Sequence, residues 1–160
     1  MKYSSQYDEL DDMDQAILRE LQADARLSNA ELARRINLSQ PAVHNRVRRL
    51  EARGFIRRYV TLLDRDMAGY DLLCFIHVRM QVHQFDQIEV FRELIKTIPQ
   101  VLECYHVTGE YDYLLKVVVR NRHDLEDLVV NHLTPIPGVA HILTSLVFAE
   151  VKYSTELPLE

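Results

Sequence analysis

The 160-residue sequence lacks long apolar segments, a secretory signal and a cysteine framework. No hydrophobic run approaches the roughly 18 residues that span a bilayer, which excludes a helical membrane protein. The first twelve residues, MKYSSQYDELDD, are acidic and have none of the apolar stretch that a signal peptide requires. Cys74 and Cys104 are the only cysteines, and both lie in apolar runs typical of strands. We therefore expect reduced core thiols in a cytoplasmic protein.

The sequence also lacks motifs that would indicate catalysis or a bound cofactor. It contains no C-x2-C zinc spacing, no Gly-rich phosphate loop, no H-E-x-x-H and no G-x-S-x-G. The seven histidines are scattered, and most are expected to be surface or hydrogen-bonded residues. With 48% hydrophobic and 27% charged residues, the composition fits a soluble globular protein of one ordinary domain or two small ones. We expect neither an enzyme nor a metal or cofactor site.

Positive charge is concentrated in one short part of the chain, although the formal net charge is -5. Residues 26–60 contain nine arginines, no lysine and only two acidic residues, for a local charge of +7. Residues 1–25 have a charge of -5, and residues 61–160 a charge of -7. The planar guanidinium fork suits phosphate and guanine, so this part indicates a nucleic-acid partner. A solvated charged face is the plainer alternative.

The arginine-rich part and the residues before it have the pattern of three short helices. Residues 11–24 combine acidic first-turn residues with an apolar stripe at helical spacing. A second helix is expected to begin at Ser28, where Glu31 three residues later forms a capping box. A third begins at Ser39 and ends at Gly54. Two helices joined by a short turn, the second basic on its outer side, predict a helix-turn-helix.

The third predicted helix and the segment after it carry side chains suited to DNA. Asn pairs with adenine and Arg with guanine, whereas small residues allow close approach to a base. We expect base contacts from Ser39, Pro41, Asn45 and Arg49, and phosphate contacts mainly from Arg46, Arg48, Arg57 and Arg58. Gln40, Ala42 and His44 complete the predicted surface. The alternating stretch 55–59 is expected to form a small wing strand. The alternative is a protein-binding three-helix module with an arginine-rich exterior.

Residues 71–153 have a coarse β-α-β-β-α-β pattern. Alternating or continuous apolar runs predict strands, and apolar residues at helical spacing predict helices that stop at prolines. The expected order is strand 72–82, helix 86–98, strand 101–108, strand 113–119, helix 124–133 and strand 141–152. The phrase Ile-Pro-Gln-Val at 98–101 returns as Ile-Pro-Gly-Val at 136–139, a faint repeat expected of a ferredoxin-like split βαβ pair.

Such a sheet has one face covered by its two helices and one open face. The open face is expected to carry Leu73, Phe75 and His77, with Leu102, Cys104 and His106 or their neighbours. A half-apolar open face needs a partner, so we expect a homodimer that pairs sheet to sheet.

The segment 106–113 combines a glycine with acidic and tyrosine side chains on a predicted tight turn. Backbone N–H groups, a carboxylate and a phenol together offer the partners that a free amino acid needs. From residue chemistry alone, an ordinary hairpin turn with Gly109 at positive φ is the simpler interpretation.

Both parts of the sequence resemble the Lrp/AsnC, or feast/famine, family of transcription regulators. In the N-terminal part, the resemblance rests on Leu-Ser at 38–39, Arg-Val at 46–47, Leu-Glu at 50–51 and Gly-Phe-Ile at 54–56. In the C-terminal part, it rests on VTGEYDYLLKV at 107–117, Ile-Pro-Gly-Val at 136–139 and Thr-Ser at 144–145. It covers roughly residues 10–153.

The resemblance implies dimers through the C-terminal domain, often assembled into tetramers or octamers. It also implies an effector pocket between dimers for an amino acid or related metabolite. The implied effector residues are His106, Thr108, Gly109, Glu110, Tyr111, Asp112 and Tyr113, with Arg122, Thr144 and Ser145 across the interface. Asp112 is the first candidate acceptor for an ammonium group. His106 and Arg122 lie where the family varies, and they are expected to select the ligand.

We therefore predict an α+β protein with two domains. A winged helix-turn-helix domain spans 11–60, a linker 61–70, and a ferredoxin-like ligand-binding and oligomerisation domain 71–153. Residues 1–10 and 154–160 are expected to be tails. The predicted function is sequence-specific transcription regulation on double-stranded DNA in response to an amino acid or related small metabolite. Two alternatives stay open: a ligand-insensitive architectural protein that wraps DNA, and a metabolite-sensing regulatory subunit of an enzyme.

Overall fold

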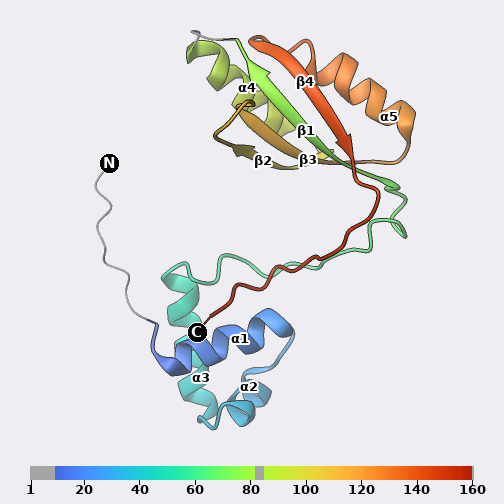
Figure 1. The fold of residues 1–160 in the computed structure, drawn as a ribbon. Helices are drawn as coiled ribbons and strands as arrows, with labels where there is room; N and C mark the ends of the chain where they lie inside the picture. Colours follow the sequence, from blue (N-terminus) through green and yellow to red (C-terminus); the bar gives the residue numbers. More distant parts are fainter. Residues whose placement is uncertain (1–9, 82–84, 160) are drawn as a thin grey trace. The chain divides into compact units, whose positions relative to one another are not determined.

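The computed structural model describes residues 10–81 and 85–159, which form two compact units (Figure 1). The first unit contains the chain up to Thr61 together with the segment from Lys152 onward, and the second contains Leu62–Val151. The polypeptide therefore runs from the first unit through the second and ends in the first again. Of the tail predicted at 1–10, residues 1–9 lie outside the described residues. No helix in the described ranges is long and apolar enough to cross a membrane.

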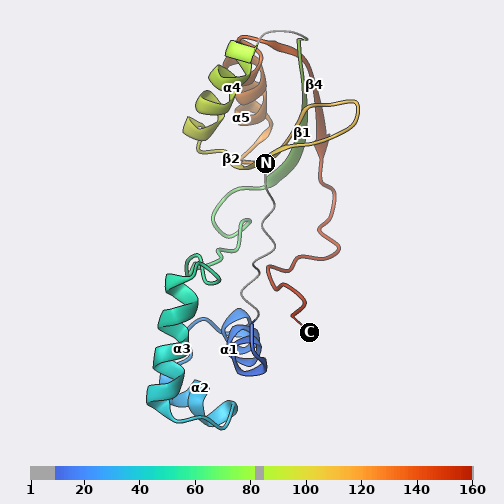
Figure 2. The same cartoon turned by 90° about the vertical axis from the view of Figure 1, so that its left-hand side faces the viewer.

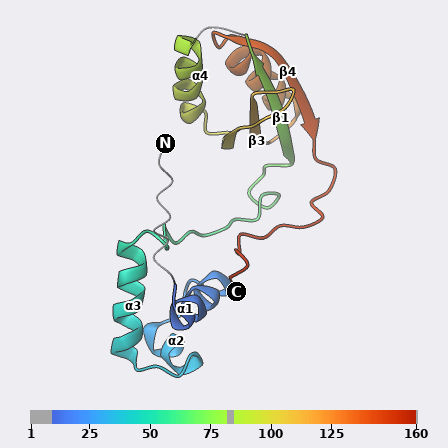
Figure 3. The same ribbon diagram turned by 60° about the vertical axis from the view of Figure 1, so that its left-hand side comes forward.

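Three helices form the first unit: α1 Asp12–Ala23, α2 Asn29–Arg35 and α3 Gln40–Ala52 (Figure 3). Each begins at a side-chain cap, because Asp11, Ser28 and Ser39 accept hydrogen bonds from first-turn N–H groups. The predicted helix starts are thus confirmed. The helices bury one shared apolar core of Ile17, Leu18, Leu32, Ala33, Val43 and Leu50.

The turn between α2 and α3 is short and depends on one unusual residue. Asn37 adopts a left-handed conformation with φ 55°, which ends α2 after two turns. The capping box at Ser28 is half formed. The hydroxyl of Ser28 accepts from the N–H of Glu31, while the Glu31 carboxylate accepts from Arg34 and Arg35 instead of the Ser28 backbone. This short connection makes the predicted helix-turn-helix.

Residues 55–59 do not form the predicted wing strand. The N–H groups of Phe55 and Ile56 donate to the carbonyl of Leu50, which closes α3 around Gly54 at φ 80°. A strand needs a neighbour to pair its backbone groups, and the described part of the first unit contains no strand. The strand prediction was therefore wrong, and Arg57 and Arg58 lie on an irregular segment.

The second unit is a four-stranded antiparallel sheet with helices on one face (Figure 2). Its strands run in the order β2-β3-β1-β4, the order of a ferredoxin-like fold, which confirms the predicted fold class. The elements are β1 Leu72–Met80, α4 Phe85–Thr97, β2 Val101–His106, β3 Tyr113–Val119, α5 Arg122–Asp127, η1 Leu128–Leu133 and β4 Val139–Leu146.

The second helix predicted at 124–133 is present, but at Leu128 it changes from the α-helix α5 to the π-helix η1. The predicted ends of two strands were wrong. β2 ends at His106 rather than at 108. The last strand ends at Leu146 rather than at 152. Leu146 already lies opposite Cys74 near the start of β1, so few β1 residues remain to pair with a longer strand. The part of the predicted strand 72–82 that falls at residue 82 lies outside the described residues.

The open face of the sheet follows from the register. Phe75 of β1 lies opposite Lys116 of β3 and Ser145 of β4, and these three side chains share the face away from the helices. On β2, Glu103 lies opposite Lys116, and Tyr105 lies opposite Leu114. The neighbours Glu103 and Tyr105 thus face outward there. Cys104 and His106 share the helix side with Leu115 and Tyr113.

Candidate nucleic-acid interface and ligand loop

The outer side of α3 carries the central part of the predicted nucleic-acid surface. Val43 and Leu50 are fully buried, so the opposite side of the helix faces outward. With 3.6 residues per turn, that side holds Pro41, Asn45 and Arg48, all of them exposed. The helix therefore presents a proline, an amide and a guanidinium in one row.

The other predicted residues of α3 lie around this row. Gln40 and His44 are exposed, and Ala42 is half-buried. The hydroxyl of Ser39 accepts a hydrogen bond from the N–H of Ala42 at 3.4 Å, so this side chain serves as the helix cap. The ring Nδ1 of His44 lies 3.2 Å from the amide nitrogen of Asn29 at the start of α2.

A cluster of ion pairs joins α1 to α3 and occupies two of the predicted DNA-binding arginines. Nη1 of Arg46 lies 2.6 Å from Asp11 and 2.7 Å from Asp14, and Nη2 of Arg49 lies 2.6 Å from Asp14. The carboxylate of Asp14 is 1% exposed. The hydrogen bond from Arg46 lowers the pKa of Asp11. The cluster fixes the position of α3 against α1.

Three predicted cations remain available on the surface. Arg48, Arg57 and Arg58 are exposed, and none of them has a hydrogen-bond or ion-pair partner within residues 10–81 and 85–159. Arg49 is also accessible in part, because its side chain is 48% exposed and only Nη2 is held by Asp14. A guanidinium has five N–H donors, so Arg49 retains donors that can contact another group.

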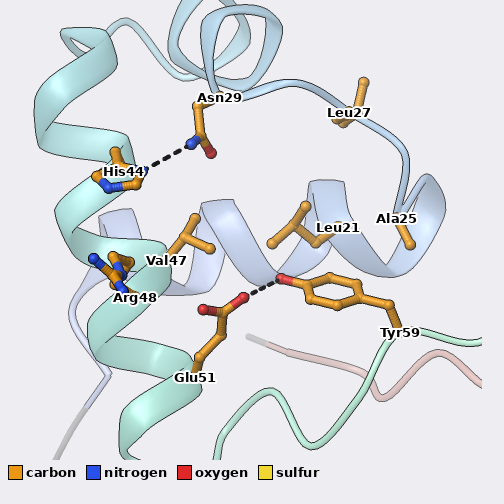
Figure 4. A pocket seen from close by; sticks show the side chains of 9 residues that line it. All are labelled: Leu21, Ala25, Leu27, Asn29, His44, Val47, Arg48, Glu51 and Tyr59. Atoms are coloured by element: carbon orange, nitrogen blue, oxygen red, sulfur yellow. Dashed lines mark hydrogen bonds between the residues drawn. The ribbon is translucent and has the colours of Figure 1, made fainter.

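An open groove of about 440 Å³ lies beside α3 (Figure 4). Leu21, Ala25, Leu27 and Val47 form its apolar wall, and its polar side chains come from Asn29, His44, Arg48, Glu51 and Tyr59. The hydroxyl of Tyr59 donates to Glu51 at 3.0 Å (Figure 4). Burial and the Glu51 carboxylate raise the pKa of Tyr59 to about 12. Tyr59 therefore anchors the chain that leaves α3.

The predicted ligand loop is a closed turn tied to β1. The N–H of Val107 donates to the carbonyl of Asp112, and Gly109 lies within this turn at φ 125°. Asp112 also donates its N–H to Val78 and accepts from the N–H of Met80 at 2.7 Å through one carboxylate oxygen. The side chain of Asp112 is therefore oriented by β1 and keeps one oxygen without a hydrogen bond in the described structure.

The structure divides the aromatic residues of the loop between the two faces of the sheet. Tyr111 lies beside two histidines of the open face, with ring centroids 5.3 Å from His77 and 6.1 Å from His141. Tyr113 is 3% exposed and stacks on His106 at 5.0 Å. The Nε of Arg92 donates to the hydroxyl of Tyr113 at 3.1 Å. Tyr113 and His106 thus belong to the helix side.

Of the remaining predicted effector residues, two lie on the loop, and Arg122, Thr144 and Ser145 are not gathered around it within one chain. Thr108 and Glu110 are exposed on the turn, and Glu110 lies 4.0 Å from Arg79. Arg122 begins α5, which follows the end of β3 that lies away from the turn. The seven residues of β3, at about 3.3 Å per residue, place that end on the order of 20 Å from the turn. Thr144 and Ser145 lie on β4, where they pair with Ile76 and Phe75 of β1. β4 pairs with neither β2 nor β3.

Sequence reasoning missed several residues of both regions. The acidic first-turn residues of the first helix do not indicate from the sequence that Asp11 and Asp14 hold Arg46 and Arg49. His77 was placed on the open face, but its contact with Tyr111 was not predicted. Among the described residues, Nδ1 of His77 is buried without a hydrogen-bond partner. Strand alternation from Tyr113 to Leu115 was a usable signal that Tyr113 is buried.

Comparisons with known proteins agree over both units. Residues 73–157 match the family model described as the Lrp/AsnC ligand binding domain, and residues 10–57 match a winged helix-turn-helix DNA-binding model. The chain is 41% identical over 145 residues to a leucine-responsive regulatory protein of Rhizobium meliloti, covering 90% of this chain and 92% of the relative. It is 38% identical over 149 residues to the leucine-responsive regulatory protein of Escherichia coli K12, covering 93% and 91%.

Solved structures share this architecture. A transcriptional regulator of Neisseria meningitidis in complex with L-Met has a TM-score of 0.90 and 35% identity, covering 94% of this chain and 97% of that one. An AsnC family transcriptional regulator of Agrobacterium tumefaciens has a TM-score of 0.88 and 32% identity, covering 93% and 97%.

Proposed function

The chain belongs to the Lrp/AsnC family of transcription regulators, and on that premise we propose that it regulates transcription by sequence-specific DNA binding in response to an amino acid. One observation carries the proposal. A single chain combines a helix-turn-helix unit, whose outer helix is rich in arginine, with a ferredoxin-like unit that holds a carboxylate at a closed turn. The first unit supplies the DNA contacts, and the second senses the ligand.

The DNA contacts divide into base readers and phosphate holders. Pro41 and Asn45 lie on the outward row of α3, where a helix in the major groove meets base edges. Arg48 shares this row, so we assign it to base contacts instead of the phosphate contacts expected from the sequence. Arg49 contributes through the donors that Asp14 leaves free. Arg57 and Arg58, on the irregular segment after α3, hold phosphates. Arg46 is bound by two carboxylates, so its main task is to position α3.

The ligand site is centred on the turn 106–113. The free oxygen of Asp112 accepts the ammonium group of an amino acid, and the backbone N–H groups beside Gly109 donate to its carboxylate. Tyr111 and its two histidine neighbours border the site on the open face. The relatives named leucine-responsive and the neighbour solved with L-Met favour an amino acid with an apolar side chain.

A second copy of the chain covers the open face. This face presents Tyr105 and Leu143, which are 51% and 44% exposed, beside the unpartnered Nδ1 of His77. Apolar groups and a buried polar atom without a partner favour coverage by another surface. Homodimers would then assemble further into tetramers or octamers. Since Arg122, Thr144 and Ser145 lie away from the loop in one chain, their contribution requires a neighbouring subunit.

Two assays test the proposal together. In a mobility-shift assay, the protein should bind the DNA upstream of its own gene more tightly than a scrambled fragment. In a thermal-shift screen of the twenty amino acids, at least one should raise the melting temperature, because a ligand that binds only the folded state stabilises it. Binding with broad footprints and no amino-acid response would indicate an architectural protein. A ligand response without DNA binding would indicate a regulatory subunit of an enzyme.

A further inference from the structure

The segment after β4 returns to the first unit and bonds to α1. Gln22 of α1 donates from Nε2 to the carbonyl of Leu157 at 3.1 Å and accepts from the N–H of Leu157 at 2.7 Å. One amide side chain thus satisfies both backbone groups of one residue. This two-way pairing fixes both the position and the direction of the segment, as a pair of strand hydrogen bonds would.

Two further contacts extend this docking. Nη1 of Arg19 lies 3.4 Å from the carbonyl of Leu159, and the side chain of Leu159 packs against the apolar core of the first unit. Arg19 and Gln22 are three residues apart on α1, so both lie on the same side of the helix. The Leu157 side chain is 69% exposed, which leaves its backbone as the bonded part. The face of α1 therefore recognises a backbone stretch and one apolar side chain.

The docked segment connects two functional regions through the chain. It follows β4, which carries Thr144 and Ser145, after about ten residues, and ten residues span at most about 36 Å. Its docking helix α1 holds α3 through the ion pairs of Asp11 and Asp14. The C-terminal segment therefore gives β4 a second covalent route to the first unit, separate from the segment that joins α3 to β1.

We propose that the Arg19 and Gln22 face of α1 is a docking surface for the chain's own residues 157–159, and that this contact couples the ligand-binding unit to DNA binding. The coupling part rests on the proposed function, whereas the docking part does not. Because the hydrogen bonds are exposed to solvent, the contact can open and close at low cost, as a regulated contact requires.

Four full-length proteins test the docking. Leu157→Pro removes the N–H that Gln22 accepts, and Gln22→Met removes both amide bonds while keeping side-chain length. Leu157→Ala is the matched control, because it keeps both backbone bonds. Hydrogen–deuterium exchange of the peptide covering 153–159 should accelerate at least fivefold in Gln22→Met and stay unchanged in Leu157→Ala. Leu157→Pro, which has no amide hydrogen there, should instead speed removal of the last residues by carboxypeptidase. Equal exchange rates in the unmodified protein and Gln22→Met, with no faster digestion of Leu157→Pro, would overturn the docking.

The coupling is measured on the same proteins. The dissociation constant for the DNA upstream of the gene is determined with and without L-leucine, and in a parallel series with and without L-methionine. In each series, the ratio of the constant with the amino acid to the constant without it is the coupling factor. We expect Gln22→Met and Leu157→Pro to change this factor at least threefold, and Leu157→Ala to leave it unchanged. If docking is lost but the factor is constant, the coupling is refuted. If the unmodified protein binds no DNA, or responds to no amino acid in the twenty-member screen, the proposed function fails while the exchange result still decides the docking.

Discussion

Replacement of Asp14 by Ala is the sharpest test of how the first unit holds α3, the helix that we propose contacts DNA. Asp14 is 1% exposed and receives Arg46 at 2.7 Å and Arg49 at 2.6 Å. Removing one partner of a buried ion pair costs about 3–5 kcal/mol of unfolding free energy. Here the two arginine side chains are 27% and 48% exposed and can regain water, which reduces the expected loss to about 2–3 kcal/mol.

The loss is large enough to be seen in thermal unfolding of the full chain. For a unit of this size, each kcal/mol shifts the melting temperature by about 4–8 °C, so the transition of the first unit should fall by about 8–24 °C. Asp12→Ala is the matched control, because Asp12 is exposed in the same helical turn and has no partner among the described residues. It should cost at most about 1 kcal/mol through the helix dipole.

The same variant has a consequence for DNA binding below its melting temperature. Arg49 is no longer oriented, so the preference for the specific site should decrease. Each arginine released from Asp14 that binds a DNA phosphate should steepen the slope of log affinity against log salt concentration by about 0.9. If Asp14→Ala melts within about 2 °C of the unmodified protein and keeps its site preference, the ion pairs do not position α3.

Three further predictions concern the surface, the loop and the groove. Arg48→Ala should relax the base preference at some operator positions, at a cost of about 1–3 kcal/mol in binding free energy. Arg57→Ala should weaken binding to all DNA sequences alike and reduce the slope of log affinity against log salt concentration by about one. Identical effects of the two variants in binding titrations would contradict these roles. Asp112→Asn should weaken amino-acid binding at least tenfold by calorimetry, and unchanged affinity would exclude Asp112 as the ammonium acceptor. Folding raises the pKa of Tyr59 from its ordinary value of 10.0 to about 12, so its contribution to stability is complete below pH 10 and is lost as the pH rises toward 12. Tyr59→Phe should remove that part of the alkaline destabilisation in denaturant titrations, and matching curves for the two proteins would disprove it.

The helices and strands were largely predictable because their signals are local. A serine directly before an apolar helical pattern is a signal for a helix start. Ser28 and Ser39 both occupy such a position, and both cap helices. The alternation of β1 and the apolar run of β3 likewise depend on nearby residues. Their order in the chain was enough to give the ferredoxin-like topology.

The features that were missed depend on residues far apart in the sequence. Asp14 meets Arg46 and Arg49 only because α1 packs on α3, and nothing near Asp14 in the sequence identifies these partners. The wing strand failed because no neighbouring strand exists in the described part of the first unit. The docking of Leu157 on Gln22 spans 135 positions, so residues near the C-terminus that were predicted to be a tail are bonded to a helix.

The central claim is that α3 reads DNA under the control of an amino acid, and a titration of the full chain tests it most directly. Fluorescence anisotropy would compare a labelled fragment from upstream of the gene with a scrambled fragment of equal length, at fixed salt, with and without the amino acid found by thermal shift. We predict at least 10³-fold tighter binding to the upstream fragment and a shift of that affinity on adding the amino acid. Equal affinity for both fragments, unmoved by the amino acid, would contradict the claim.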